Sequence, residues 1–136
     1  MTAPESVVET YVEAYNDRDL ETLGELFNDP FQFNGDSMHV DDFLGLVQNY
    51  WEVFPDLILD HTHRIVEGEF VFDRHTFEAE ATGEYYGHDV AGRSVESSEM
   101  MLFRVRNGTI EEYWYEWDEL GFWNQLGILA DPYADG

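Results

Sequence analysis

One stretch near the end of the chain, residues 107–127, restricts the fold more than any other part of the sequence. It reads NGTIEEYWYEWDELGFWNQLG and begins with Asn107-Gly108 between two strand-like runs. This pair suits the two positive-φ positions of a type I′ turn, a common connection in β-hairpins. A strand over residues 109–117 then leads to Asp118 and a short helix over residues 119–126. We therefore expect a hairpin, an aromatic strand, an acid and a closing helix.

The expected strand has two unlike faces, because successive side chains of a strand point in opposite directions. With strict alternation, one face carries Ile110, Glu112, Trp114 and Glu116, and Asp118 follows on the same face. The other face carries Tyr113, Tyr115 and Trp117. An acid at the end of such a strand, surrounded by aromatic side chains, is a candidate pocket base.

Helices precede strands in the rest of the chain. Helical spacing of apolar residues predicts helices over residues 4–15, 19–27 and 41–54, with a short strand at residues 31–33. Strand-like runs follow over residues 57–66, 70–82 and 95–106, and a glycine-containing loop covers residues 83–92. This order predicts an α+β fold. We expect an α+β barrel, in which N-terminal helices pack on the concave face of a cone-shaped, curved antiparallel sheet and leave a cavity.

The length of 136 residues suits a single domain over residues 1–136, in which residues 131–136 form a loose tail. The absence of cysteine excludes disulfide and thiol chemistry. The start, MTAPES, lacks the features of a signal peptide, and no apolar run reaches the roughly 20 residues of a membrane span. These observations predict a cytoplasmic protein.

The charge is strongly one-sided, with 30 acidic residues against 6 basic ones, all arginine, and a net charge of −24. Such a charge repels itself in dilute buffer, whereas about 1 M salt shortens the Debye length to about 3 Å. We therefore expect a halophilic protein from a cell with molar internal salt; the alternative is an acidic surface that only confers solubility. Nucleic acids and anionic membranes are excluded as partners, because phosphate binding needs clustered positive charge.

Several motifs resemble those of the SnoaL-like polyketide cyclase family. Phe54-Pro55-Asp56-Leu57 resembles the FPDL that opens its sheet, and Gly83-Glu84, Gly87 and Gly92-Arg93 resemble the loop between its middle strands. Its closing signature is similar to Arg106-Asn107-Gly108-Thr109-Ile110, Glu112, Trp114, Asp118, Gly121 and Gln125-Leu126-Gly127. The resemblance covers nearly the whole chain.

This resemblance implies the cone-shaped α+β barrel of the nuclear transport factor two superfamily, and chemistry without a cofactor. In the cyclases, an acid at the position of Asp118 is taken as the proton-transfer residue of an intramolecular aldol closure. The chain departs from the family at Glu80-Ala81-Thr82, where many members read glycine-threonine-histidine, and at residues 87–91, which replace a proline-rich segment. These departures alter the expected pocket rim and leave the substrate open.

Asp118 is the main catalytic candidate, because apolar walls such as Trp114 raise a carboxyl pKa and strengthen a base. Asp118 also directly precedes a helix, where it suits an N-cap, and one residue can do both. Arg74 lies inside an apolar strand and needs an acidic partner. It is expected either to form a structural ion pair or to position Asp118, as in the aspartate–arginine–aspartate sites of related epoxide hydrolases.

His75 points away from Arg74 and is expected either as a pocket acid–base or as a packed side chain. Tyr15 lies on the first helix, where related ketosteroid isomerases place an oxyanion donor. The substrate-binding candidates are Tyr15, Trp51, Phe54 and Trp114. Core packing is the alternative for Tyr15, Trp51 and Phe54, and a cone fold would bring Trp51 and Phe54 near the cavity mouth. Two histidines at spacing two, His61 and His63, are too few for a metal site, and we expect neither metal nor cofactor.

Three functions remain open at this point. The first is binding of a small hydrophobic carbonyl compound with cofactor-free cyclisation or isomerisation through Asp118. The second is a non-catalytic ligand-binding or accessory domain, and the third is epoxide hydrolysis through Asp118 and Arg74. We also expect a homodimer packed sheet against sheet, because an exposed face of Tyr113, Tyr115 and Trp117 would need a cover.

Overall fold

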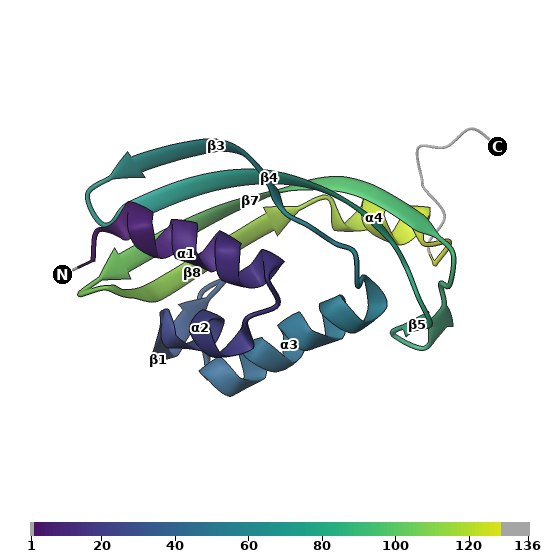
Figure 1. Cartoon of the computed structure of the whole chain (residues 1–136), viewed down its shortest axis with the longest axis horizontal. Helices are drawn as coiled ribbons and strands as arrows, with labels where there is room; N and C mark the ends of the chain where they lie inside the picture. The colour runs from purple at the N-terminus through teal and green to yellow at the C-terminus, as the bar shows by residue number, and fades with distance from the viewer. Residues whose placement is uncertain (1, 129–136) are drawn as a thin grey trace.

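The computed structural model describes residues 2–128, in which helices pack against one large curved sheet (Figure 1). The elements are α1 (Pro4–Asn16), α2 (Leu20–Glu25), β1 (Phe27–Phe33), β2 (Asp36–Met38), α3 (Val40–Val53), β3 (Asp60–Glu67), β4 (Phe70–Glu80), β5 (Glu84–Tyr85), β6 (His88–Asp89), β7 (Ser94–Arg106), β8 (Thr109–Trp117) and α4 (Glu119–Gln125). The α+β order is confirmed. The expected tail at residues 131–136 lies outside the described residues.

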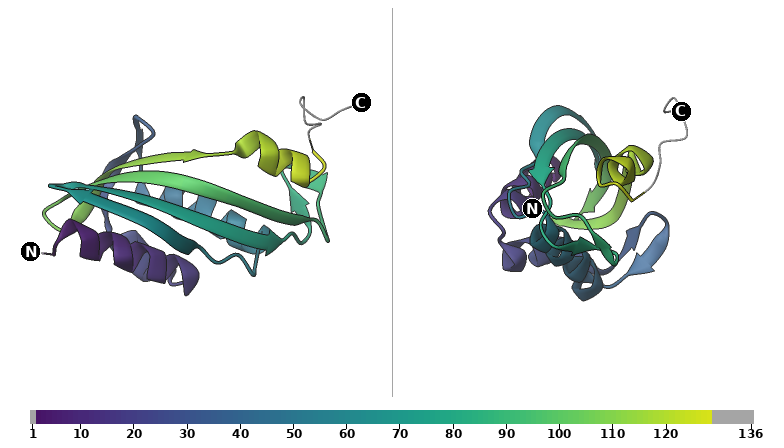
Figure 2. Two further views of the ribbon diagram at one scale, coloured as in Figure 1. Left: turned by 90° about the horizontal axis from the view of Figure 1, so that it is seen from above. Right: turned by 90° about the vertical axis from the view of Figure 1, so that its right-hand side faces the viewer.

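The large sheet has the strand order β2-β1-β8-β7-β4-β3. Its neighbouring strands are antiparallel except β1 and β8, which run parallel. The longest strands, β4 and β7, have 11 and 13 residues, and strands of this length twist and curl. Figure 2 shows the sheet curving around the helices. The β5–β6 hairpin occupies part of residues 83–92, where a loop was expected.

The three N-terminal helices cover the concave face of the sheet, as the cone fold requires (Figure 1). Pro4 starts α1, and the Asp19 side chain caps α2 by accepting a hydrogen bond from the Thr22 backbone N–H. The inward stripes of α1 and α3 meet the inner sides of β4, β7 and β8 in one apolar core. Within residues 2–128, no helix combines the length and apolarity that crossing a membrane would take.

The β7–β8 hairpin contains both the expected turn and an unexpected bulge. Asn107 and Gly108 have φ values of 54° and 80°, which fit the type I′ prediction. Two register pairs, Val105 with Ile110 and Arg104 with Glu112, leave one extra residue on β8. Such a bulge moves every later side chain to the opposite face.

The bulge corrects the expected faces of β8. Ile110 and Tyr113 are both buried, although strict alternation placed them on opposite faces. Tyr113, Tyr115 and Trp117 therefore face the helices, whereas Trp114 lies on the outer side with 39% of its surface exposed. The aromatic row that was expected to need a dimer partner is covered by the chain's own helices.

Candidate functional site

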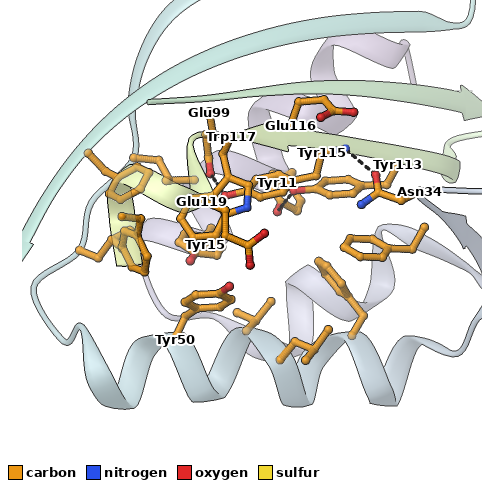
Figure 3. A pocket seen from close by; sticks show the side chains of 18 of the residues that line it. Tyr11, Tyr15, Asn34, Tyr50, Glu99, Tyr113, Tyr115, Glu116, Trp117 and Glu119 are labelled. Carbon is orange, nitrogen blue, oxygen red and sulfur yellow. Dashed lines mark hydrogen bonds between the residues drawn. The ribbon is translucent and has the colours of Figure 1, made fainter. Parts of the chain in front are cut away.

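A cavity of about 370 Å³ lies between the inner face of the sheet and helices α1 and α3 (Figure 3). Its wall is mainly aromatic and aliphatic, and its residues are Tyr11, Tyr15, Phe33, Asn34, Phe43, Leu46, Val47, Tyr50, Leu57, Leu59, Phe77, Tyr86, Glu99, Tyr113, Tyr115, Glu116, Trp117, Glu119 and Phe122. Its more exposed wall residues include Tyr86 (62%) and Leu46 (41%). A largely apolar hollow of this size, with a few polar groups, is the usual form of a small-molecule site.

The most buried acid of this wall is Glu99, on the inner side of β7, with 5% of its surface exposed. The Tyr115 hydroxyl donates a hydrogen bond to Glu99 Oε2. The other carboxylate oxygen, Oε1, lies 3.2 Å from Nδ1 of His75. Strands β4, β7 and β8 therefore each supply one residue to this group, and the carboxylate is held from two directions at the cavity wall.

From Glu99, a chain of charged groups runs along the inner face of the sheet, across β4 to β3, and ends at the surface on α1. Nε2 of His75 lies 2.9 Å from Oδ2 of Asp73, and both side chains are completely buried. Arg64 donates two hydrogen bonds to Asp73, of 2.7 Å from Nε and 2.8 Å from Nη2. Its Nη1 lies 3.4 Å from Glu9 Oε1, on the exposed side of α1. Because each buried charge has a partner, the chain avoids the large cost of an isolated ion.

The two buried partners have shifted pKa values of opposite sign. Burial acts to lower the pKa of His75, but the hydrogen bonds to Asp73 and Glu99 outweigh it, so the pKa rises above its ordinary value. Burial acts to raise the pKa of Asp73, but the bonds from Arg64 and His75 outweigh it, so the pKa falls. An imidazolium between two carboxylates satisfies both contacts, because each ring nitrogen then donates to an oxygen.

Burial, followed by the charge of Glu99, raises the pKa of Tyr15 and Tyr115 well above the ordinary value, and burial is also the main cause of the raised pKa of Tyr50. These hydroxyls remain protonated at neutral pH and can donate hydrogen bonds. The Tyr115 proton is already used by Glu99. Tyr113 donates to Met101 Sδ at 3.0 Å.

Tyr15 and Tyr50 each keep a hydroxyl proton that no other contact uses. Tyr50 accepts a hydrogen bond from Tyr85 at 3.3 Å, so its own proton is not used in that contact. The Tyr15 hydroxyl has no hydrogen-bond partner among residues 2–128. Both residues line the cavity, Tyr15 from α1 and Tyr50 from α3 (Figure 3). The site therefore combines one held carboxylate with hydroxyl donors that include Tyr15 and Tyr50.

The profile of the SnoaL-like polyketide cyclase family matches residues 5–126. The chain belongs to the SnoaL-like polyketide cyclase family. IdmH, a candidate polyketide cyclase from Streptomyces antibioticus, superposes with a TM-score of 0.81 at 27% identity, covering 93% of this chain and 100% of IdmH. AclR, a candidate hydroxylase from Streptomyces galilaeus, superposes with a TM-score of 0.83 at 23% identity, covering 94% of this chain and 87% of AclR.

A SnoaL-like polyketide cyclase from Agrobacterium tumefaciens has a TM-score of 0.80 at 19% identity and covers 93% of this chain and 100% of that chain. No curated protein matches the sequence. The cone fold is therefore shared among SnoaL-like proteins whose sequences have diverged widely.

Asp118, the acid of the family's closing signature, does not line the cavity of this SnoaL-like protein. Its carboxylate accepts a 2.9 Å hydrogen bond from the Gly121 N–H and caps α4. A Cβ at Gly121 would lie 2.1 Å from Asp118 Oδ2, so glycine leaves room for this cap. The side chain is exposed and borders a separate hollow outside the cavity.

Arg74 borders the same outer hollow as Asp118. Its Nη1 donates to the Thr62 hydroxyl at 3.1 Å, and within the described chain it forms no ion pair with a carboxylate. The expected acidic partner is therefore missing there, because Arg74 lies on the outer and partly exposed side of β4, where water can solvate its charge.

The remaining predicted residues divide between wall and core. Tyr15 lines the cavity, and His75 touches it only through Glu99. Trp51 packs against Tyr15 and lies under the Arg18 guanidinium, and Phe54 is fully buried against Phe122. Neither borders the cavity, and Trp114 does not border it either.

Sequence reasoning missed Glu99, although the sequence contained a signal for it. Glu99 shares its alternation parity with Val95, Met101, Phe103 and Val105. A single acid in a row that is apolar except for Ser97 predicts a buried carboxylate that needs partners. Residues 2–128 contain no group of three or more metal-binding side chains with suitable geometry.

Proposed function

We propose that this SnoaL-like protein binds a small hydrophobic carbonyl compound and catalyses cofactor-free proton transfer, with Glu99 as the acid–base. The observation that carries the proposal is the Glu99 carboxylate, which lies in the aromatic wall and is held by Tyr115 and His75. A base held in a dry, apolar site is suited to removing a proton beside a carbonyl group. The family name and the resemblance of IdmH, a candidate polyketide cyclase, support the same class of reaction.

In the proposed reaction, Glu99 takes a proton from the carbon beside a ligand carbonyl. The electron pair of the broken C–H bond moves towards the carbonyl oxygen, which becomes an enolate oxyanion. Tyr15 and Tyr50 donate hydrogen bonds to this oxygen, since their protons are not used elsewhere in the site. The enolate carbon then bonds to a second carbonyl of the same molecule, and Glu99 returns the proton to the new alkoxide; in an isomerisation it returns the proton to another carbon.

This assignment moves the proton-transfer role from Asp118 to Glu99. Epoxide hydrolysis through Asp118 and Arg74 is less well supported, because both side chains border the outer hollow and neither faces the aromatic cavity. A role in ligand binding without turnover uses the same cavity, and an assay of proton exchange separates the two.

A suitable test is the exchange of the acidic protons of β-tetralone, a flat neutral ketone, in deuterated buffer followed by NMR. Wild-type protein should accelerate exchange, and Glu99→Gln should lower the rate by a factor of roughly 10² to 10⁴ while β-tetralone still binds. Tyr15→Phe should lower the rate less and leave the base intact. Binding of β-tetralone without exchange above the buffer rate would instead support a non-catalytic ligand-binding role.

The homodimer remains a proposal, on a different face from the one expected. One apolar row, Ile65, Phe72, Leu102 and Trp114, crosses four strands on the outer side of the sheet. The two rows that flank it contain Arg74 and Arg104 beside Glu67, Glu112 and Glu116, so these central rows carry little net charge although the chain carries −24. A second copy, equally acidic, can approach these rows with less repulsion than it would meet elsewhere.

Light scattering in molar KCl tests the dimer. Wild-type protein should have the mass of two chains, and Leu102→Glu should have the mass of one. Leu120→Glu, an equally exposed apolar position on α4, is the matched control and should remain dimeric. A monomeric wild type would contradict the proposal.

Molar salt inside the source cell is also proposed, together with a cytoplasmic location. Ion pairs among residues 2–128 use seven acids, namely Glu9, Asp29, Glu69, Asp73, Glu99, Glu111 and Glu112. Most of the 30 acids therefore lack a cationic partner and repel one another unless salt screens them. Unfolding free energy should rise with KCl concentration, and equal stability in low and molar KCl would contradict this.

A further inference from the structure

The cavity contains no positive charge at its wall. No arginine, lysine or histidine of residues 2–128 borders it. The chain has no lysine, and its six arginines are at Arg18, Arg64, Arg74, Arg93, Arg104 and Arg106. Most of these bind backbone carbonyls or carboxylates outside the cavity. A ligand inside therefore meets no cation that could bind an anionic group.

Two acids of the wall decide the charge of this space, namely Glu99 and Glu119. The charge of Glu99 is balanced by His75 behind it. Glu119 forms no ion pair within the described part of the chain. Figure 3 shows the Glu119 carboxylate turned towards the cavity, and its charge contributes to the raised pKa of Tyr50 on the opposite wall. Glu116 also borders the cavity, but it belongs to the outer row of the sheet, opposite Met100. Glu119 therefore leaves the cavity with an unbalanced negative charge.

We propose that this cavity selects ligands by charge: it admits uncharged and cationic compounds and rejects anions. An anion would lose its hydration in a largely apolar space and gain no cationic partner in return. It would also meet the charge of Glu119, whose repulsion the low-dielectric walls strengthen. The Tyr15 hydroxyl, which has no partner among residues 2–128, gives a neutral carbonyl a donor that requires no charge.

This selectivity rests on the proposed ligand site but not on any reaction there. It narrows the substrate class to neutral or amine-bearing carbonyl compounds. Free carboxylates and phosphate-bearing carriers are excluded, although many small metabolites belong to those two groups. Among the acids of the wall, Glu119 contributes most to the selection against anions, because its unpaired carboxylate is turned towards the cavity.

Three probes with the same aromatic body test the proposal, namely acetonaphthone, naphthoate and naphthylmethylamine. Calorimetric titration is carried out at the lowest KCl concentration at which circular dichroism shows folded protein, so that screening is minimal. Acetonaphthone and naphthylmethylamine should bind. Naphthoate should bind at least about tenfold more weakly than acetonaphthone, because it loses its hydration and meets the like charge of Glu119.

Glu119→Gln should reduce the preference against naphthoate to about threefold or less. Glu25→Gln removes an exposed acid outside the cavity and should leave the preference unchanged. If acetonaphthone and naphthoate bind equally well to wild-type protein, the selectivity is overturned while the ligand site stands. If acetonaphthone does not bind, the ligand site is overturned and the selectivity with it.

Discussion

Neighbouring charged residues on the two faces of the same sheet differ in burial and in hydrogen-bond partners. On the inner face of β4, His75 is completely buried and lies between two carboxylates. One residue earlier, Arg74 points outwards, is partly exposed and donates to a threonine hydroxyl. The same contrast separates Glu99, in the cavity wall, from Asp118, which caps a helix in contact with water. Burial, and not residue type, decides which charged group becomes part of the inner hydrogen-bonded chain.

The contrast also shows what a sequence signature can and cannot identify. The closing motif carries an acid three residues before a glycine, and this spacing serves the α4 cap through the Gly121 N–H. The charged chain from Arg64 to Glu99 has no such motif, because its members come from three strands that meet only in the fold. Four changes, taken from the largest expected effect to the smallest, test the difference between the faces.

Asp73→Asn should have the largest effect on stability. It removes the buried carboxylate that pairs with both Arg64 and His75, and breaking such a pair costs about 3 to 5 kcal/mol of unfolding free energy. Denaturant unfolding in molar KCl measures this loss. A loss below about 1 kcal/mol would mean that the buried ion pairs of Asp73 contribute no more to stability than a surface ion pair.

His75→Gln should change how stability depends on pH. The raised pKa of His75 contributes stability fully below its ordinary value of 6.5, and this contribution is lost as the pH rises through the folded pKa. The lowered pKa of Asp73 contributes stability above its ordinary value of 3.8, and this is lost as the pH falls. The stability difference between wild type and His75→Gln should therefore shrink as the pH rises above 6.5, and a constant difference would contradict the shift.

Asp118→Ala should have a smaller, purely structural effect. Loss of a helix N-cap costs about 1 kcal/mol of unfolding free energy. Asp118→Asn keeps a capping oxygen and should recover most of that stability. Thermal unfolding of the two variants, side by side, measures the difference; equal losses in both would show that the charge of Asp118 matters beyond the cap.

Arg74→Gln should have the smallest effect, at most about 0.5 kcal/mol, because a partly exposed side chain on the outer face loses one hydrogen bond to Thr62. The same denaturant titration in molar KCl serves as the measurement. A loss comparable to that of Asp73→Asn would remove the distinction between the two faces.

Much of the fold was predictable because its signals are local. Turn residues, helical spacing and alternation identified the hairpin, the helices and the limits of the long strands β4, β7 and β8. The bulge near Ile110 was not predictable, because an extra residue in one strand leaves no mark in a pattern read one strand at a time. That single residue reversed the expected faces of Trp114 and Tyr115. Among the residues proposed from the sequence, Tyr15 lines the cavity. The partners of Glu99 come from neighbouring strands, so its place in the site became clear only from the fold.

The most direct test of the inner site compares Glu99→Gln with Asp118→Asn in the same β-tetralone exchange assay. Both variants remove one carboxylate charge and keep the shape of the side chain. We expect the Glu99→Gln rate to fall by at least about 10²-fold and the Asp118→Asn rate to stay within about twofold of wild type. The reverse result would contradict the account and return the proton-transfer role to the acid at the end of β8.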